Sequence, residues 1–218
     1  MNIPDFFHRT TLTFVKKELQ KDDIYSFYFS PKKPLHHRAG QHGLFTIPGI
    51  PTFRIFSLAS APEEPYVMIS THVRAESNFK QGLAALKEGD AIHMLGPVLE
   101  FTLQADRKKV VFLGQGIGIT PFRSMLLHTP KNDTRITLIH VDRADHTFRK
   151  ETEVAADEAY YPTTPEEFTT AITSVVEKQK DALYYLSGSP GFNKGTTQTL
   201  LSLGIPSHSI KKDNFLGY

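Results

Sequence analysis

A glycine-rich segment near the middle of the chain has the composition of a phosphate-binding loop. Gly114, Gly116 and Gly118 follow an apolar run, and Thr120 and Pro121 come directly after them. Glycines let a large anionic ligand lie close to the backbone, and a helix that begins just afterwards adds the partial positive charge of its N-terminus. The segment has proline where the common dinucleotide fingerprint has its third glycine. It predicts either a nucleotide-binding loop or a strand-to-helix turn chosen only for close packing.

A second group of residues with chemical potential lies in the first half of the chain, at Arg54, Phe56 and Ser57. On a strand, Arg54 and Phe56 share one face and Ser57 points to the other. Arginine binds phosphate through two parallel hydrogen bonds, an aromatic ring can cover a flat ligand, and a hydroxyl can hydrogen-bond a ring heteroatom. The alternative interpretation, a surface arginine beside a core phenylalanine, stays open at this point.

Composition excludes several classes of protein. The chain has 218 residues, 39% of them hydrophobic and 22% charged, which is ordinary for a globular protein. The net charge of +2 gives no reason to expect a nucleic-acid partner or an anionic membrane surface. The sequence has no apolar run long enough for a membrane span and no signal-peptide pattern at its start, so we expect a cytoplasmic protein.

The absence of cysteine restricts the chemistry further. Without thiolates the chain cannot form a disulfide, use a cysteine nucleophile or hold a cysteine-ligated iron–sulfur cluster. The ten histidines do not form the HExxH pattern, and we predict no metal site. Redox chemistry would therefore need a bound organic cofactor, or a metal held by histidine or carboxylate.

The first half of the sequence is typical of a β-barrel. Its short apolar and alternating segments are separated by Pro, Gly and charged residues, a pattern that favours a closed or nearly closed antiparallel barrel. The expected strands cover residues 11–19, 23–31, 41–47, 53–60, 66–73 and 90–96. The first two should form a hairpin. One helix, from about residue 79 to 89, places Phe79, Leu83 and Leu86 on one face.

After about residue 105 the pattern changes to alternating strands and helices, which predicts a parallel sheet with right-handed crossovers. Thr120 is expected to cap one helix, and Thr164 caps another that starts at Pro165 and has Glu167 three residues after the cap. The expected strands cover residues 110–114, 135–141, 182–188 and 208–215. We therefore predict an antiparallel barrel over residues 1–104 and an α/β domain over residues 105–218.

The ordered set of motifs resembles the ferredoxin–NADP reductase family. The set is RxFS at 54–57, SNFKQGLAALKEGD at 77–90, GP at 96–97, GQGIGITPF at 114–122, SGSP at 187–190 and NFLGY at 214–218. Each motif is weak alone, but their order covers the chain from about residue 10 to its end. The resemblance implies a six-stranded antiparallel flavin-binding β-barrel followed by a parallel-sheet pyridine-nucleotide-binding domain.

The resemblance also implies a set of flavin-binding residues. In the family the arginine holds the flavin phosphates, the aromatic packs on the isoalloxazine ring and the serine contacts the N5 region. By this resemblance the FAD site comprises Arg54, Ile55, Phe56, Ser57, His72, Val73, Arg74, Ser77, Asn78, Phe79 and Lys80. FAD is implied in preference to FMN. For Lys80 the alternative is a solvated lysine at the start of a helix.

A second set of residues is implied for the nicotinamide nucleotide. It comprises Gly114, Gly116, Gly118, Ile119, Thr120, Pro121, Arg143, Ser187, Gly188, Ser189, Pro190, Phe215 and Tyr218. Phe215 and Tyr218 match a terminal segment that can cover the flavin in the family. The residues implied closest to the reacting rings, and so assigned as catalytic, are Ser57, Thr120, Ser187 and Tyr218.

The chain departs from the family pattern at four places. Phe56 stands where tyrosine is usual, and Ser187 stands where cysteine is frequent. The glycine often found soon after Gly96-Pro97 is missing, and residues 154–162 lack a Ser-Arg pair that could clasp a 2′-phosphate. These differences bear on the flavin-side loop, the nicotinamide contact and the preference for NADPH.

The activity implied is that of an NAD(P)H-dependent flavin oxidoreductase. Hydride passes from the nicotinamide to the flavin, and the electrons go to a separate acceptor such as a ferredoxin, a flavodoxin, another redox protein or a small oxidant. The choice of NADH or NADPH stays open, because Asp142 and Arg143 favour opposite answers. Two alternatives are a flavin-binding electron-transfer component that uses nicotinamide weakly, and a non-enzymatic nucleotide-binding module.

Overall fold

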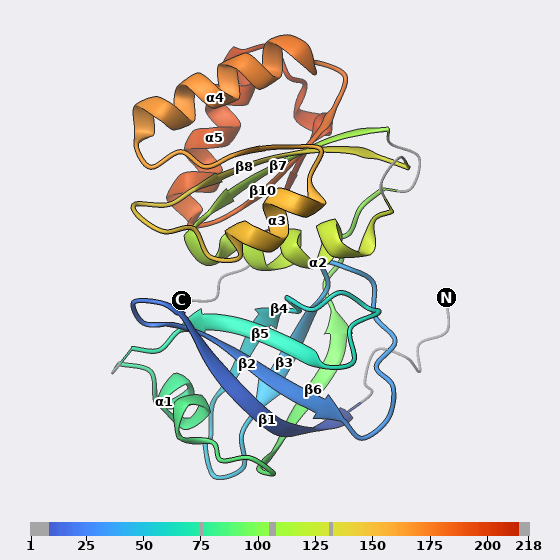
Figure 1. The fold of residues 1–218 in the computed structure, drawn as a ribbon, viewed down its shortest axis with the longest axis vertical. Helices are drawn as coiled ribbons and strands as arrows, with labels where there is room; N and C mark the ends of the chain where they lie inside the picture. The colour runs from blue at the N-terminus through green and yellow to red at the C-terminus, as the bar shows by residue number, and fades with distance from the viewer. Residues whose placement is uncertain (1–8, 75, 105–107, 131–132, 214–218) are drawn as a thin grey trace. The chain divides into compact units, whose positions relative to one another are not determined.

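The computed structural model describes residues 9–74, 76–104, 108–130 and 133–213. The chain divides into two compact units (Figure 1). The described residues up to Thr102 form the barrel unit, and those from Leu103 onward form the parallel-sheet unit. Among the described residues we find no helix with the length and hydropathy needed to cross a membrane.

The barrel unit is a curled antiparallel sheet of six strands in the order β4-β3-β6-β1-β2-β5 (Figure 1). Its strands are β1 (Arg9–Lys21), β2 (Ile24–Pro31), β3 (His42–Thr46), β4 (Phe53–Ser57), β5 (Val67–His72) and β6 (Ala91–Val98). Just beyond β4, the Ala59 N–H donates to the Met68 carbonyl of β5 at 2.8 Å. This bond joins the two ends of the sheet, which confirms the predicted six-stranded antiparallel barrel.

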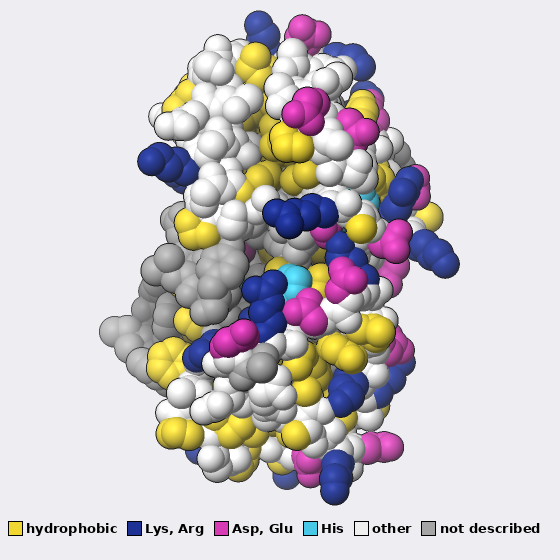
Figure 2. All heavy atoms as spheres, turned by 90° about the vertical axis from the view of Figure 1, so that its left-hand side faces the viewer, with side chains coloured by type: hydrophobic (Ala, Val, Ile, Leu, Met, Phe, Trp, Pro, Cys, Tyr) yellow, Lys and Arg dark blue, Asp and Glu magenta, His cyan; other side chains and the backbone are white. Residues whose placement is uncertain are grey.

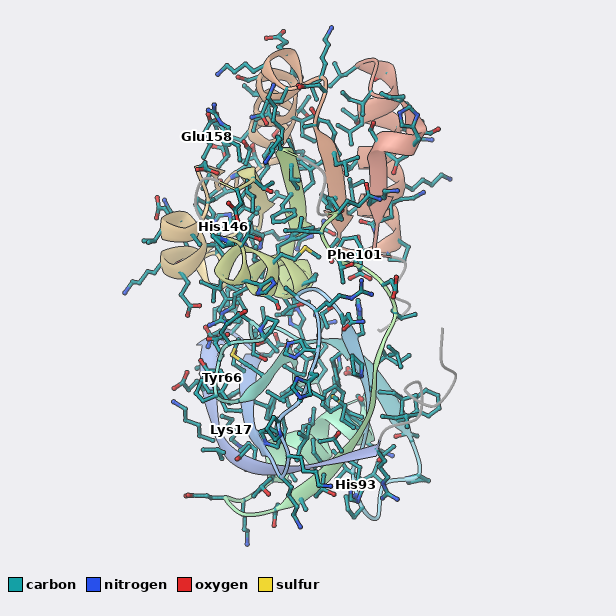
Figure 3. The ribbon with its side chains drawn as sticks, turned by 90° about the vertical axis from the view of Figure 1, so that its right-hand side faces the viewer. Lys17, Tyr66, His93, Phe101, His146 and Glu158 are labelled. Carbon is teal, nitrogen blue, oxygen red and sulfur yellow. The ribbon has the colours of Figure 1, made fainter. Side chains whose placement is uncertain are left out.

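Side chains on the inner face of the curled sheet form the core of the barrel unit. Phe14, Phe27 and Phe29 alternate along β1 and β2 and are almost completely buried, as strand geometry requires of every second residue. Helix α1 (Asn78–Ala85) adds Phe79 and Leu83 to the same core. Lys17 of β1 donates its ammonium to the Ala84 carbonyl in the last turn of α1, so the helix is also fastened at its C-terminal end (Figure 3).

The parallel-sheet unit has five strands in the order β11-β10-β7-β8-β9 (Figure 1). They are β7 (Lys109–Gln115), β8 (Arg135–Val141), β9 (Glu158–Tyr160), β10 (Leu183–Ser187) and β11 (Ile210–Lys212). The helices are α2 (Thr120–His128), α3 (Arg149–Ala155), α4 (Pro165–Lys178) and α5 (Pro190–Ser202). Short 3-10 turns lie at Gly116–Ile119 and Ser207–Ser209. The central strands β7, β8 and β10 are buried along almost their whole length, because helices cover a parallel sheet on both faces.

The helix starts agree only partly with the sequence-based expectations. Thr164 caps α4 as predicted, since its hydroxyl accepts the Glu167 N–H. Thr120 is not a cap, and this prediction was wrong: the 3-10 turn at Gly116–Ile119 runs directly into α2, so Thr120 is already helical. Its hydroxyl instead donates to the Ile117 carbonyl at 3.0 Å. Helix α3 and strand β9 were not expected.

Candidate functional site

Three basic residues from three separate elements come together in the barrel unit. Arg54 lies on β4, Arg74 follows β5, and Lys80 lies in the first turn of α1. Burial lowers the pKa of the half-buried Lys80, and the positive charges of Arg74 and Arg54 lower it further, against the opposite effect of Asp23. Three cations this close repel one another, so an anion bound among them would be strongly stabilised. We call Arg54, Arg74 and Lys80 the basic cluster.

The start of α1 adds hydrogen-bond donors to the basic cluster. Ser77 caps the helix by accepting the Lys80 N–H, and the first turn contains Asn78 and Phe79 but no acidic residue. The N-terminal end of a helix carries partial positive charge and favours anions. The side chain of Phe79 is fully buried in the barrel core, so only its backbone faces the helix start.

One carboxylate, not anticipated from the sequence, organises the edge of this cluster. Asp23, in the β1–β2 turn, accepts from His72 Nδ1 at 2.6 Å and from Arg74 Nε at 3.3 Å. Burial by itself would raise the pKa of Asp23, but the hydrogen bonds and charges of His72 and Arg74 outweigh it and the pKa is lowered. The Val73 N–H also donates to the Asp23 carbonyl at 2.8 Å, so the segment after β5 is held at several points. Figure 2 shows basic and acidic side chains side by side around a histidine on the face that it presents.

The other implied flavin residues of β4 are more deeply buried. Phe56 is 8% exposed, and its ring centroid lies 5.8 Å from that of Phe45 and 6.0 Å from that of Phe79. Most of the ring is therefore packed in the barrel core, whereas Ile55 is half-buried. Ser57 is also buried and lies 3.1 Å from His42 Nε2. Stacking of Phe56 on the isoalloxazine ring of the flavin therefore stays a prediction.

In the parallel-sheet unit the glycine-rich segment lies at the carboxyl end of the sheet. Gly114 of β7 pairs in register with Ser187 of β10 and with His140 of β8, so the loops after these strands are neighbours. In open parallel sheets, ligands bind beyond this end of the strands. His140 Nε2 lies 2.9 Å from the Gly116 carbonyl, which fixes the turn that follows β7.

The glycines of this segment serve two different purposes. A Cβ atom at Gly118 would lie 2.2 Å from the Ser187 carbonyl oxygen, so close packing of two loops requires glycine there. Gly116 has φ +52°, and no atom lies within 4 Å of the position its Cβ would take. Close packing thus explains the glycine at Gly118, whereas the backbone at Gly116 is open, and nucleotide binding by this segment stays a prediction.

A buried polar network surrounds Ser187. Its hydroxyl donates to Asp213 Oδ2 at 3.2 Å, and Asn193 Nδ2 donates to the Asp213 carbonyl at 3.0 Å. All three residues are at least nine-tenths buried. Asp213 lies just after β11. The sequence did not predict this contact, because Asp213 comes close to Ser187 only through the pairing of β11 with β10. Ser187 therefore has a fixed orientation, set by a carboxylate.

The remaining residues implied for the nucleotide differ in position. Ile119, Thr120 and Pro121 are buried where the 3-10 turn meets α2. Arg143 is exposed after β8, and its backbone N–H donates to Asp142 Oδ1 at 2.8 Å, while its guanidinium makes no ion pair with any residue that the structure describes. Phe215 and Tyr218 lie outside the described residues.

Beside the end of β8 lies a group of rings that the sequence did not suggest. The ring centroid of His146 is 5.2 Å from that of His140 and 5.2 Å from that of Tyr161. His146 Nε2 is also 3.1 Å from the Pro162 carbonyl. The ring of His146 therefore packs against His140, the residue whose Nε2 contacts the Gly116 carbonyl. In the parts of the chain that the structure describes, no three His, Asp or Glu side chains group in a way that could hold a metal ion.

The sequence and the fold of this chain are both similar to those of known proteins. No family model matches the sequence. A flavohemoprotein of Bacillus subtilis is 30% identical in an alignment that covers 92% of this chain and 57% of that protein. The chain therefore spans little more than half the length of this relative.

Among the solved structures that resemble this chain, two match over nearly their full length. One is the flavohem-like FAD/NAD binding domain of nitric oxide dioxygenase from Vibrio cholerae O1 biovar El Tor, with a TM-score of 0.76, 22% identity, and 94% of this chain and 97% of that one covered. The other is ferredoxin-NADP+ reductase from Plasmodium falciparum, with a TM-score of 0.74, 14% identity, and 94% and 95% covered.

These findings define the class of protein. The chain has the two-part fold of the ferredoxin–NADP reductase-like FAD/NAD-binding domains, and the resemblance predicted from its motifs is confirmed. Within that class, its sequence relatives include flavohemoproteins.

Proposed function

We propose that this chain is an NAD(P)H-dependent flavin oxidoreductase that passes electrons to a separate acceptor. Residues 1–104 form its FAD-binding barrel, and residues 105–218 form its NAD(P)-binding domain. The fold class and the flavohemoprotein relative support this assignment. The observation that carries it is the basic cluster, in which a half-buried ammonium lies near two guanidinium groups.

The residues of the barrel unit fit the diphosphate of FAD. Arg54 and Arg74 supply planar donors, Lys80 supplies a point charge, and the first turn of α1 supplies backbone N–H groups. The cluster holds more positive charge than Asp23 neutralises, and a diphosphate would supply the missing negative charge. Asp23 orients Arg74 through its hydrogen bond, and His72 braces Asp23 from the other side.

The residues of the parallel-sheet unit fit a dinucleotide. The open backbone at Gly116 and the capped start of α5 at Ser189 offer N–H groups to a pyrophosphate. Ser187, oriented by Asp213, presents a hydroxyl oxygen at the same end of the sheet, where the nicotinamide is expected. Thr120 turns its hydroxyl back onto Ile117, so we assign it a role in shaping the turn.

When bound, the flavin supplies the ability to accept a hydride and release electrons singly, which no side chain of this cysteine-free chain supplies. The chain itself binds the two cofactors and orients them. The acceptor is a redox protein, such as a ferredoxin or flavodoxin, a partner domain, or a small oxidant. Because a relative of this chain is a longer protein named flavohemoprotein, a haem protein or haem domain is the acceptor that we favour.

The test is anaerobic reduction of the FAD-reconstituted chain by NADH and by NADPH, followed through the flavin absorbance. Rapid bleaching by either nucleotide is the expected result. A chain that binds FAD but is bleached by neither nucleotide would be an electron-transfer component that does not use nicotinamide. A chain that takes up no flavin would be a nucleotide-binding module, and the proposal would be wrong.

A further inference from the structure

The side chain of Gln115 joins the two loops at the carboxyl end of the parallel sheet. Gln115 is the last residue of β7, and its Oε1 accepts the Ser189 hydroxyl at 2.7 Å and the Ser189 backbone N–H at 3.3 Å. A Cβ atom at Gly188 would lie 2.8 Å from the Gln115 Cβ. The glutamine stem therefore lies flat against the β10–α5 loop, and its amide is bonded to the residue that caps α5.

These contacts fix which way the amide points. A backbone N–H can only donate, so the atom facing Ser189 must be the amide oxygen. The Ser189 hydroxyl accepts the Phe192 N–H as the helix cap, and it uses its own proton on Gln115. The amide NH₂ must then point away from Ser189, and it donates no hydrogen bond to any of the residues that the structure describes. Gln115 is also exposed, so the NH₂ group is open to a ligand.

The position of this NH₂ group is the one at which a dinucleotide would need a donor. Gln115 directly precedes Gly116, whose backbone is open, and the neighbouring loop begins α5 with Ser189. Both loops lie where parallel sheets bind ligands, and both offer partial positive charge to an anion. A diphosphate across these loops would accept from backbone N–H groups, and the Gln115 amide is a side-chain donor on the residue directly before Gly116.

We propose that Gln115 is a nucleotide-binding residue, which fastens the β10–α5 loop with its amide oxygen and donates its amide NH₂ to the diphosphate of the nicotinamide nucleotide. This inference rests on the proposed function, since it names a further binding residue of the same site. It goes beyond the motif-based expectation, which named Gly114, Gly116, Gly118, Ile119, Thr120 and Pro121 in this segment and gave the side chain of Gln115 no role.

The experiment measures the binding of ADP-ribose and of NADH to the full chain by calorimetry, with four variants. Gln115→Glu keeps an oxygen for Ser189 but replaces the donor with a negative charge. Gln115→Met keeps the length of the side chain and removes both functions. Gln198→Glu makes the same charge change on an exposed position of α5 and is the matched control. Gln115→Ala removes the whole contact.

We expect the dissociation constant for ADP-ribose to rise about tenfold or more in Gln115→Glu, and about three- to tenfold in Gln115→Met and Gln115→Ala, as the loss of one hydrogen bond implies. The order is the decisive result, because a merely structural clamp would be rescued by glutamate. Binding by Gln115→Glu within about twofold of wild type would overturn the proposal, as would an equal loss in Gln198→Glu.

The inference and the proposed function fail in different ways. If the wild-type chain binds neither ADP-ribose nor NADH, the proposed function itself is wrong. If the wild-type chain binds both and the Gln115 variants bind equally well, only the role of Gln115 is wrong. Thermal unfolding of each variant, measured without ligand, shows whether a loss of binding follows from a loss of fold.

Discussion

Asp23 and His72 form a close pair, with 2.6 Å between the carboxylate Oδ1 and the ring Nδ1. The two residues come from different parts of the barrel unit, the β1–β2 turn and the end of β5. Since Arg74 shares the other oxygen of the same carboxylate, Asp23 holds one arginine of the basic cluster in a defined orientation. The proposed FAD site thus depends on a residue that is not expected to touch the cofactor.

Replacing Asp23 with Asn should therefore weaken FAD binding without unfolding the chain. The amide keeps the size of the carboxylate but not its charge, so Arg74 loses its ion pair and becomes disordered before binding. We expect the FAD dissociation constant to rise about three- to tenfold, measured by fluorescence quenching of added FAD, as for the loss of one such contact. Asp22→Asn is the matched control, because Asp22 is the exposed neighbour in the same turn. Equal effects of the two substitutions would contradict the role of Asp23.

The same pair predicts a pH dependence of stability. The pKa of Asp23 is lowered in the folded chain, so its carboxylate stabilises the fold above the ordinary Asp value of 3.8. This contribution is lost as the pH falls through the lowered folded pKa. The difference in Tm between wild type and Asp23→Asn should therefore be present at neutral pH and vanish at the acid end of a thermal unfolding series. A difference that stays constant across that series would exclude the carboxylate as its source.

Lys80 should lower the stability of the ligand-free chain while it favours FAD binding. Its pKa is lowered by burial and by Arg74 and Arg54, so the charged form costs free energy in the fold. Lys80→Met keeps the aliphatic stem and removes the charge, and we expect Tm to rise by about 1–3 °C and FAD affinity to fall. Lys87→Met, an exposed position just beyond α1, should change neither quantity.

The charged form of Lys80 destabilises the fold, whereas the charged form of Asp23 stabilises it, yet both lowered pKa values make stability rise with pH, in an alkaline range for Lys80 and an acid range for Asp23. The unfolded chain holds the Lys80 proton up to the ordinary value of 10.5, whereas the folded chain releases it at lower pH. Stability therefore rises with pH between the two values. The Tm advantage of Lys80→Met over wild type should be full at neutral pH and shrink in alkaline buffer. An advantage that grows with pH would show that the lysine charge is not its cause.

Arg54 is the residue of β4 whose loss should affect FAD most directly. Its guanidinium donates to the adjacent Phe53 carbonyl at 2.8 Å and forms no ion pair with a carboxylate among the described residues, so it is available to a phosphate. Removing a charge-assisted hydrogen bond of this type costs about 1.5–3 kcal/mol, which corresponds to roughly 10- to 150-fold in FAD affinity. Flavin retention of Arg54→Ala on gel filtration, compared with Lys87→Ala, measures the effect. Full retention by Arg54→Ala would remove Arg54 from the site.

Hydrophobic periodicity was sufficient to predict the barrel and the parallel sheet, because it reports burial along one face of an element. The cap signal at Thr164 marked the start of α4. Helix α3 was missed because its N-cap is Phe148, a left-handed residue with no capping side chain, so the sequence has no start signal there. The pair of Asp23 and His72 was missed because it spans 49 residues and depends on the pairing of β2 with β5. Asp213 likewise reaches Ser187 only through the position of β11 beside β10.

The contact of Gly118 with the β10–α5 loop gives a direct test of the glycine-rich segment. A methyl group at Gly118 would meet the Ser187 carbonyl oxygen at 2.2 Å and the Ser187 carbonyl carbon at 2.6 Å, both of them backbone atoms that cannot swing aside. Gly118→Ala must separate the two loops, at a cost of about 1–3 kcal/mol in the free energy of unfolding. Because the loops form the proposed nucleotide site, ADP-ribose affinity should fall as well.

Gly191→Ala is the matched control for this substitution. Gly191 lies in the first turn of α5, and no atom is within 4 Å of the position its Cβ would take. Alanine there reduces the freedom of the unfolded chain, and stability should rise by about 0.4–1 kcal/mol, measured by urea unfolding. If Gly118→Ala were as stable as Gly191→Ala, the loop after β7 would not lie against Ser187, and the proposed geometry of the nucleotide site would fail with it.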